Sequence, residues 1–139
     1  MKQVAAYIRV STIGSGADLI VTVNEEIDGS ITITACAADC EGSLNIPAEI
    51  NGKSVTVIGS GAFSGCEYIE EIILPESVEK IEPYAFYGCS SLEKITIPKS
   101  VTSIGERAFM ECPGLTDVYY GGTEEQWKKI ETGIYNEKL

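Results

Sequence analysis

The sequence predicts a solenoid of stacked repeats of about 23 residues, with a parallel β-sheet along one face. Phe63, Phe86 and Phe109 lie 23 residues apart, and each occupies the same frame, Ile-x-x-x-Ala-Phe-x-x-Cys-x-x-Leu/Ile-x-x-Ile/Val. When apolar and small positions recur together, each repeat buries its apolar face on its neighbours. The 139 residues are therefore expected to form one domain with a modest core.

The segment before the repeats divides into three parts. Residues 1–18 lie outside the repeats and are expected to be a leader, with a Gly- and Ser-rich linker at 13–18. Residues 19–23 and 31–35 are β-rich runs separated by a turn-prone stretch that ends at Asp28-Gly29. We expect them to form a β-hairpin within an N-terminal cap, residues 19–42, because the first repeat would otherwise expose its apolar face.

The repeats are assigned to residues 43–120, beginning with a partial one. Residues 44–47 (LNIP) match 72–75 (IILP) and 95–98 (ITIP), so they are the strand of an incomplete first repeat. Compared with the later repeats, this one has five extra residues around Asn51-Gly52, which are expected to form a loop.

Each full repeat is predicted to contain a strand, a second extended side and a corner. The strand alternates with period two, and its proline ends it by removing a donor from the ladder. The Ala-Phe-x-x-Cys stretch is predicted to form a tight helical or 3₁₀ corner, with Phe in the middle of the core. The inward strand positions are Ile72 and Leu74, Ile95 and Ile97, and Val118 and Tyr120.

The C-terminal segment, residues 121–139, is predicted to cap the stack with a short helix. Gly121-Gly122 replaces the proline of the earlier repeats, and Thr123 with Gln126 matches a capping box. Trp127 and Ile130 are expected to lie on one face of this helix and to close the end of the core.

Charge and composition narrow the classes of partner. The net charge is −11, from 21 acidic and 10 basic residues. Such a negative charge repels nucleic acid and anionic lipid and favours cationic partners. The absence of histidine excludes His-based catalysis and His metal ligands.

No apolar run is long enough for membrane insertion. The N-terminus lacks a secretory signal, so we expect either a cytoplasmic protein or one whose leader is missing, and the compartment stays open.

The five cysteines fall into a column and a pair. Cys66, Cys89 and Cys112 occupy equivalent positions on successive repeats, roughly 5 Å apart, and are expected to be buried free thiols rather than a disulfide, redox or metal site. Cys36 and Cys40 lie in an irregular loop, which leaves open whether they pair. No cofactor and no metal is predicted.

The outward strand positions are the predicted binding residues, because they fail to repeat. One column alternates in charge and suits either an ion-pair row or a solvated face. The other includes an apolar and an aromatic side chain, which mark contact surfaces when they are exposed. The residues of the two columns that we expect to bind a partner are Glu71, Lys94 and Asp117, and Ile73, Thr96 and Tyr119.

Over residues 27–139 the sequence resembles the BspA-like, or Treponema-type, leucine-rich repeat family. Phrases such as residues 104–112 (IGERAFMEC) and the ending at 118–127 (VYYGGTEEQW) carry the resemblance. It implies a leucine-rich-repeat solenoid that serves as a non-catalytic protein-interaction or adhesion module, often in bacterial surface or secreted proteins. Its partner would be a protein or a cell-surface component, and the family supplies no catalytic residues.

Two alternatives belong to other classes. One is a structural spacer or repeat remnant without its own ligand, which would self-associate end to end through imperfect caps. The other is a serine recombinase fragment, because residues 7–12 (YIRVST) resemble the opening strand of those enzymes and place their nucleophile at Ser11. The remaining catalytic domain and its arginines do not follow, and Ser11 without them is not activated. A leader added from elsewhere or a hybrid reading frame explains this segment better.

Overall fold

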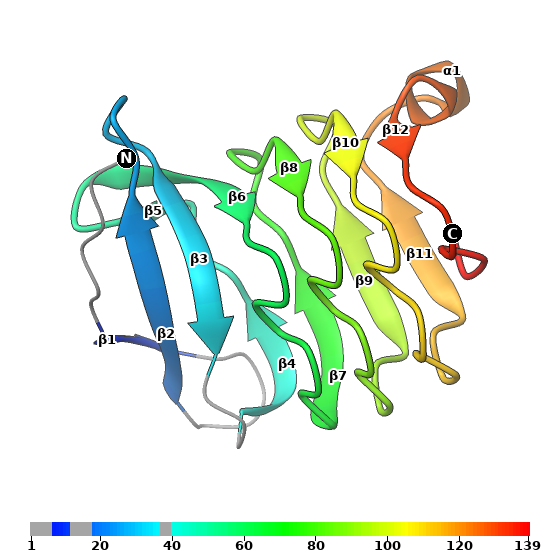
Figure 1. Ribbon diagram of the computed structural model, residues 1–139, viewed down its shortest axis with the longest axis horizontal. Helices are drawn as coiled ribbons and strands as arrows, with labels where there is room; N and C mark the ends of the chain where they lie inside the picture. The colour runs from blue at the N-terminus through cyan, green and yellow to red at the C-terminus, as the bar shows by residue number, and fades with distance from the viewer. Residues whose placement is uncertain (1–6, 12–17, 37–39) are drawn as a thin grey trace.

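The computed structural model describes residues 7–11, 18–36 and 40–139. The chain winds between two sheets, and successive strands of each turn alternate between them (Figure 1). Sheet I consists of β4 (Glu41–Asn45), β7 (Tyr68–Ile73), β9 (Lys94–Ile97) and β11 (Asp117–Tyr120), all parallel. This architecture confirms the predicted solenoid with a parallel sheet along one face.

The second extended side of each repeat is itself part of a sheet, here called sheet II. Its strands follow the order β1-β2-β3-β6-β8-β10-β12, and pairing is parallel from β3 onward. The strand bounds are β1 Tyr7–Ser11, β2 Asp18–Glu25, β3 Ile31–Cys36, β6 Lys53–Ile58, β8 Lys80–Ile81, β10 Ser103–Ile104 and β12 Glu131–Thr132.

The predicted N-terminal hairpin is present as β2 and β3, which pair antiparallel. Ser30 closes its turn by donating from its backbone N–H and its hydroxyl to Asp28 Oδ1, at 2.9 and 2.6 Å. Because β3 also pairs with β6, the hairpin extends sheet II. Strand β1, from the expected leader, pairs antiparallel with β2. The linker predicted at 13–18 lies outside the described residues except for Asp18.

The core is a stack of equivalent side chains along the solenoid axis. The rings of Phe63 and Phe86 lie 5.2 Å apart at 14°, and those of Phe86 and Phe109 have the same geometry. All three rings are buried, as are the inward residues Ile72 and Ile95 of sheet I. The repeat spacing therefore brings identical groups into contact from one rung to the next.

The corners, which the sequence predicted as tight helical or 3₁₀ segments, are a succession of turns. Hydrogen bonds from Ala62 N to Gly59 O and from Cys66 N to Phe63 O span three residues, as in a 3₁₀-helix. Positive φ values of 66° at Gly61 and 74° at Gly65 interrupt the helix, because a left-handed residue reverses the local course of the chain.

Successive corners are joined by backbone hydrogen bonds. Phe63 N donates to Ala85 O at 2.7 Å, and Phe86 N donates to Ala108 O at 2.9 Å. The flanking amides of Gly61 and Gly65 donate to the next rung in the same way. The corners thus form a third ladder besides the two sheets, which satisfies amides that lie next to the buried core.

The extra residues of the partial repeat form the expected loop, as a short hairpin. Strand β5 (Glu49–Ile50) pairs antiparallel with the start of β6. Asn51 and Gly52 connect them with φ values of 52° and 75°, the pattern of a two-residue type I′ turn.

The C-terminal cap contains the predicted helix, α1 (Glu124–Lys128). The capping box is confirmed, because Gln126 N donates to Thr123 Oγ1 at 3.1 Å and Thr123 N donates to Gln126 Oε1 at 2.8 Å. Trp127 packs on Tyr120 with ring centroids 5.1 Å apart. The helix ends before Ile130, so Ile130 is buried from the following turn and not from the face that carries Trp127.

Beyond the helix, β12 continues sheet II by pairing with β10. Among the described residues, no helix has the length and apolar character needed to cross a membrane.

Candidate binding faces

The outward face of sheet I carries the two predicted columns in register. Glu71 pairs with Lys94 and Lys94 with Asp117, while Ile73 pairs with Thr96 and Thr96 with Tyr119. All six side chains are at least partly exposed. On β7 and β9 they alternate with buried residues, and on β11 with the partly buried Val118 and Tyr120. The structure therefore brings every predicted binding residue onto one surface; whether that surface binds a partner remains a prediction.

The charged column of sheet I is a solvated row rather than a chain of ion pairs. Within the described part of the chain, no salt bridge joins Lys94 to Glu71 or to Asp117. Glu71 instead accepts a hydrogen bond of 2.6 Å from the Ser43 hydroxyl on β4. Of the two alternatives for this column, the structure favours the solvated one.

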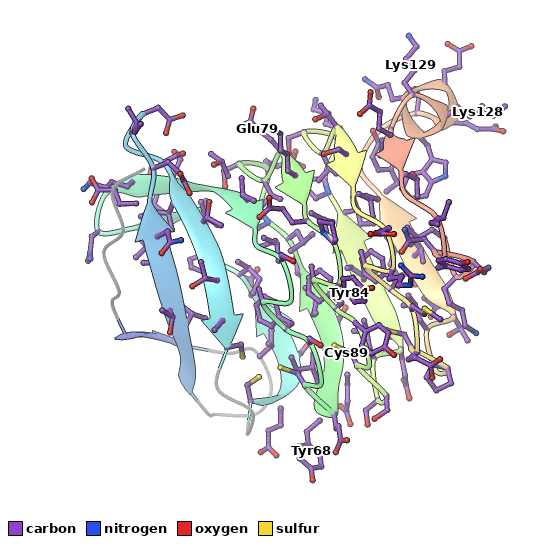
Figure 2. The ribbon with its side chains drawn as sticks, viewed as in Figure 1. Tyr68, Glu79, Tyr84, Cys89, Lys128 and Lys129 are labelled. Atoms are coloured by element: carbon purple, nitrogen blue, oxygen red, sulfur yellow. The ribbon has the colours of Figure 1, made fainter. Side chains whose placement is uncertain are left out.

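The second column carries the apolar contact area of sheet I. Tyr119 is 54% exposed, while its neighbours Val118 and Tyr120 are partly buried. Ile73 is partly exposed two strands away. Tyr68, at the start of β7, is 59% exposed and projects from the lower rim of the molecule in Figure 2. Aromatic and aliphatic groups placed this way can be desolvated by a partner.

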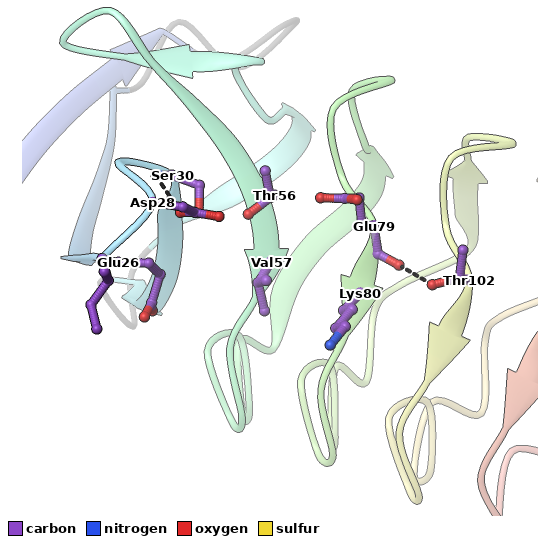
Figure 3. A pocket seen from close by; sticks show the side chains of 9 residues that line it. Glu26, Asp28, Ser30, Thr56, Val57, Glu79, Lys80 and Thr102 are labelled. Atoms are coloured by element: carbon purple, nitrogen blue, oxygen red, sulfur yellow. Dashed lines mark hydrogen bonds between the residues drawn. The ribbon is translucent and has the colours of Figure 1, made fainter. Parts of the chain in front are cut away.

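Sheet II has a hollowed outward surface that the sequence did not predict. An open groove of about 600 Å³ crosses β6, β8 and β10 beside the hairpin turn (Figure 3). Val57 and Lys80 line it and belong to a column that continues through Ser103 and Glu131, in register across four strands. The acidic side chains at its edge are Glu26, Asp28 and Glu79.

The electrostatic potential in this groove is set mainly by its acidic side chains. Lys80 is the only basic residue among the nine that line it, against the three acids. At Asp28 the hydrogen bonds from the Ser30 hydroxyl and backbone lower the pKa of the carboxyl below its usual value of 3.8. The Thr102 hydroxyl donates to the backbone oxygen of Glu79 at 3.2 Å, which ties two neighbouring rungs together. The groove therefore suits a basic ligand better than an acidic one.

A signal for this groove was present in the sequence. Val57, Lys80 and Ser103 recur at 23-residue spacing and differ from one another, and in the neighbouring column Glu79 differs from Thr56 and Thr102. These positions fail to repeat in the same way as the sheet I columns. Because the second extended side is only two residues long in most rungs, the sequence does not indicate that it forms a sheet with an outward surface.

The cysteine column is confirmed as buried free thiols at Cys66, Cys89 and Cys112. Cys89 Sγ donates to Phe63 O at 3.2 Å and Cys112 Sγ donates to Phe86 O at 3.1 Å, each on the preceding rung. A hydrogen bond with Cys112, together with burial, raises the pKa of Cys89. Cys89 and Cys112 therefore serve as small core residues.

The sequence leaves open whether Cys36 and Cys40 pair, and in the structure they lie next to each other without a disulfide bond. Their Sγ atoms lie 2.6 Å apart and share a hydrogen bond, so the two side chains meet. The Cys66 sulfur joins them, with all three sulfurs within 4.8 Å of one another. Hydrogen bonds from Cys36 and Cys40 lower the pKa of Cys66 to about 4.

Comparison with known proteins identifies the architecture. The family model described as "BspA type Leucine rich repeat region (6 copies)" matches residues 39–137. A leucine-rich repeat protein from Bacteroides ovatus is similar at 32% identity and a TM-score of 0.63, over 70% of this chain and 27% of that one. A leucine-rich repeat protein from Bacteroides capillosus is similar at 27% identity and a TM-score of 0.53, over 81% of this chain and all of that one.

A leucine-rich repeat protein from T. pallidum shares the fold at 23% identity and a TM-score of 0.54, over 73% of this chain and 62% of that one. The chain thus spans about a quarter of the B. ovatus protein and less than two thirds of the T. pallidum protein. A search of curated proteins found no match. The recombinase resemblance gains no support: the family match begins at residue 39, and β1, which carries Ser11, pairs with β2 in sheet II.

Proposed function

Because this chain belongs to the BspA-type leucine-rich repeat family, we propose that it is a non-catalytic module that binds a protein partner on the outward face of sheet I. Leucine-rich repeats generally act as protein-interaction modules and are generally non-enzymatic. The scaffold is rigid, since two parallel sheets and the corner ladder fix every rung to the next. Binding would then depend on surface complementarity, with little ordering of the module itself.

The observation that carries this proposal is the column Ile73, Thr96 and Tyr119. These side chains are in register on adjacent parallel strands and place an aliphatic, a hydroxyl-bearing and an aromatic group in one row. Glu71, Lys94 and Asp117 run beside it as a polar margin. An apolar strip bordered by solvated charges is the usual organisation of a contact surface.

The net charge indicates the chemistry of the partner. At −11, the module attracts proteins whose contact surface is basic and repels acidic ones. We therefore expect a partner with a basic rim, whose association slows as the ionic strength rises. Cell-surface adhesion is one setting in which such a module would act.

The experiment compares two surfaces of one scaffold. Proteins retained by the immobilised chain are identified, and the strongest binder is purified and its Kd measured. The Ile73→Ala/Tyr119→Ala double variant should weaken that purified binder by at least ~30-fold, because each truncation removes a hot-spot side chain. Unchanged affinity for the double variant would overturn the assignment of sheet I.

A matched control lies on the opposite surface. Val57→Ala/Thr102→Ala alters the groove of sheet II and leaves sheet I intact. It should bind the purified partner as tightly as the unaltered chain. If this variant alone loses the partner, the acidic groove is the binding surface and the interaction function stands on the other face.

A structural spacer is a second candidate, favoured by one observation at the C-terminal end. An open hollow of about 320 Å³ lies between β11 and α1, lined in part by Val118, Trp127 and Leu139. The cap therefore leaves apolar surface at the end of the stack, where a second copy could dock. Sedimentation over a range of concentrations separates the candidates, since a spacer should associate end to end and a dedicated binding module should stay monomeric.

A further inference from the structure

Three thiols from separate segments meet at the N-terminal end of the solenoid. Cys36 ends β3 in sheet II, and Cys40 immediately precedes β4 in sheet I. Cys66 lies in the first corner, between β6 and β7. Their Sγ atoms all lie within 4.8 Å of one another, with Cys40 and Cys66 buried and Cys36 partly exposed. The cluster therefore has two enclosed sulfurs and one that faces solvent.

We propose that Cys36, Cys40 and Cys66 form a three-thiolate site for a thiophilic divalent cation of the zinc class. The chemistry of the donors supports this choice, because thiolate sulfur selects Zn²⁺ and related soft or borderline ions over Mg²⁺ and Ca²⁺. The chain has no histidine, and no carboxylate of the described residues belongs to the cluster. A sulfur-only donor set is therefore the one available to a bound ion.

The sulfur spacing fits such an ion after a small adjustment. A tetrahedral Zn²⁺ with Zn–S bonds of about 2.3 Å holds its sulfurs roughly 3.8 Å apart. Two sides of the sulfur triangle are already within 4.8 Å. The 2.6 Å separation of Cys36 and Cys40 would open by about 1 Å. Three protein ligands leave a fourth position, which solvent can reach on the side of the partly exposed Cys36.

A bound ion would join three segments of the chain. It would tie the end of the hairpin to the start of sheet I and to the first complete corner. Metal binding would then stabilise the N-terminal end of the stack, because the ion binds only when these segments are folded together. The sequence does not predict this site, because Cys36 and Cys40 have a Cys-x-x-x-Cys spacing and the third ligand comes from a corner 26 residues after Cys40.

The test uses the full chain, reduced and kept under argon, with Co²⁺ as the spectroscopic probe and Zn²⁺ as the competitor. One Co²⁺ per chain should produce thiolate-to-cobalt charge-transfer absorption and visible tetrahedral bands, and Zn²⁺ should displace it. Cys36→Ser and Cys66→Ser should each weaken binding by more than ~100-fold, since loss of even an outer-shell partner costs 10–100-fold. Cys112→Ser, which removes a thiol two rungs away, should bind as the unaltered chain does.

Folding is followed in the same samples by circular dichroism and thermal melting. Zn²⁺ should raise the Tm of the unaltered chain and of Cys112→Ser, and should leave that of Cys36→Ser unchanged. Cys36 is partly exposed at the end of a strand, so its serine variant is the one best able to fold without metal.

Three results would overturn the proposal. One is the absence of charge-transfer absorption from the reduced chain, and another is equal binding by Cys36→Ser and the unaltered chain. The third is an intact mass lighter by two hydrogens in reducing buffer with no metal taken up, together with a cross-linked peptide that locates the disulfide between Cys36 and Cys40.

Discussion

The backbone N–H of Phe109 donates a 3.0 Å hydrogen bond to the side-chain Oδ1 of Asn136. In the two preceding rungs the same amide donates to a backbone carbonyl, from Phe63 to Ala85 and from Phe86 to Ala108. After the last complete rung, no further Ala-Phe corner follows to supply that carbonyl. The Asn136 amide group takes its place and anchors itself by donating to Gly105 O and Gly133 O, both at 2.9 Å. The Asn136 side chain therefore ends the ladder at the phenylalanine position, while Arg107 N still donates to a backbone oxygen, that of Ile134, at 2.9 Å.

Asn136→Ala should destabilise the domain by about 1–3 kcal/mol, because it leaves the amide of the last corner without its acceptor. Urea denaturation measures the loss, and hydrogen exchange should show that the Phe109 amide loses protection. Asn45→Ala is the matched control, since Asn45 is exposed on β4. Equal stability of the two variants would show that Asn136 does not terminate the ladder.

Phe86→Leu should destabilise the fold more than Phe63→Leu, by about 0.5–1.5 kcal/mol. Both rings are fully buried, so the loss of apolar area is similar. Phe86 stacks on a ring at each side, whereas Phe63 stacks on one, and each aromatic pair contributes roughly that amount beyond burial. Equilibrium unfolding of the two variants gives the difference directly, and a reversed order would contradict a continuous stack.

Gly105→Ala should cost about 1–3 kcal/mol through overpacking. A Cβ at this position would lie 2.3 Å from Pro83 N and 2.6 Å from Glu82 C, both backbone atoms of the preceding rung. Gly121→Ala is the same change at a site whose nearest atom is 3.4 Å away, and its effect should stay within about 0.5 kcal/mol. Thermal or urea melts compare the two; similar values would mean that the rungs can separate without cost.

Acidification should loosen the hairpin turn at Asp28. Hydrogen bonds from Ser30 lower the pKa of this carboxyl below 3.8, so its stabilising effect is fully present above the unfolded value and is lost as pH falls through the folded pKa. NMR titration of the Asp28 carboxyl should give a midpoint below 3.8, and Ser30→Ala should raise that midpoint. A midpoint that is the same in both chains would show that the turn hydrogen bonds do not form in solution.

Much of the rung could be predicted because its determinants are local and repeated. The 23-residue interval fixed which residues face inward, and the register of Glu71, Lys94 and Asp117 across sheet I followed from it. The capping box at Thr123 was equally predictable, since its two partners are three residues apart. The corners differed from expectation because positive φ at Gly61 and Gly65 breaks a helical course that their sequence also permits.

By itself, the sequence determined that this chain is a repeat solenoid with a stacked phenylalanine core, because a strict interval leaves equivalent side chains only one way to bury their apolar surface. The tertiary structure decided how the ends are completed and which surfaces are formed. Asn136 reaching the amide of Phe109, the groove across sheet II and the approach of Cys66 to Cys36 and Cys40 all join segments far apart in the chain. Such contacts depend on how many rungs stack and where the flanking strands pair, and no local pattern of residues specifies either.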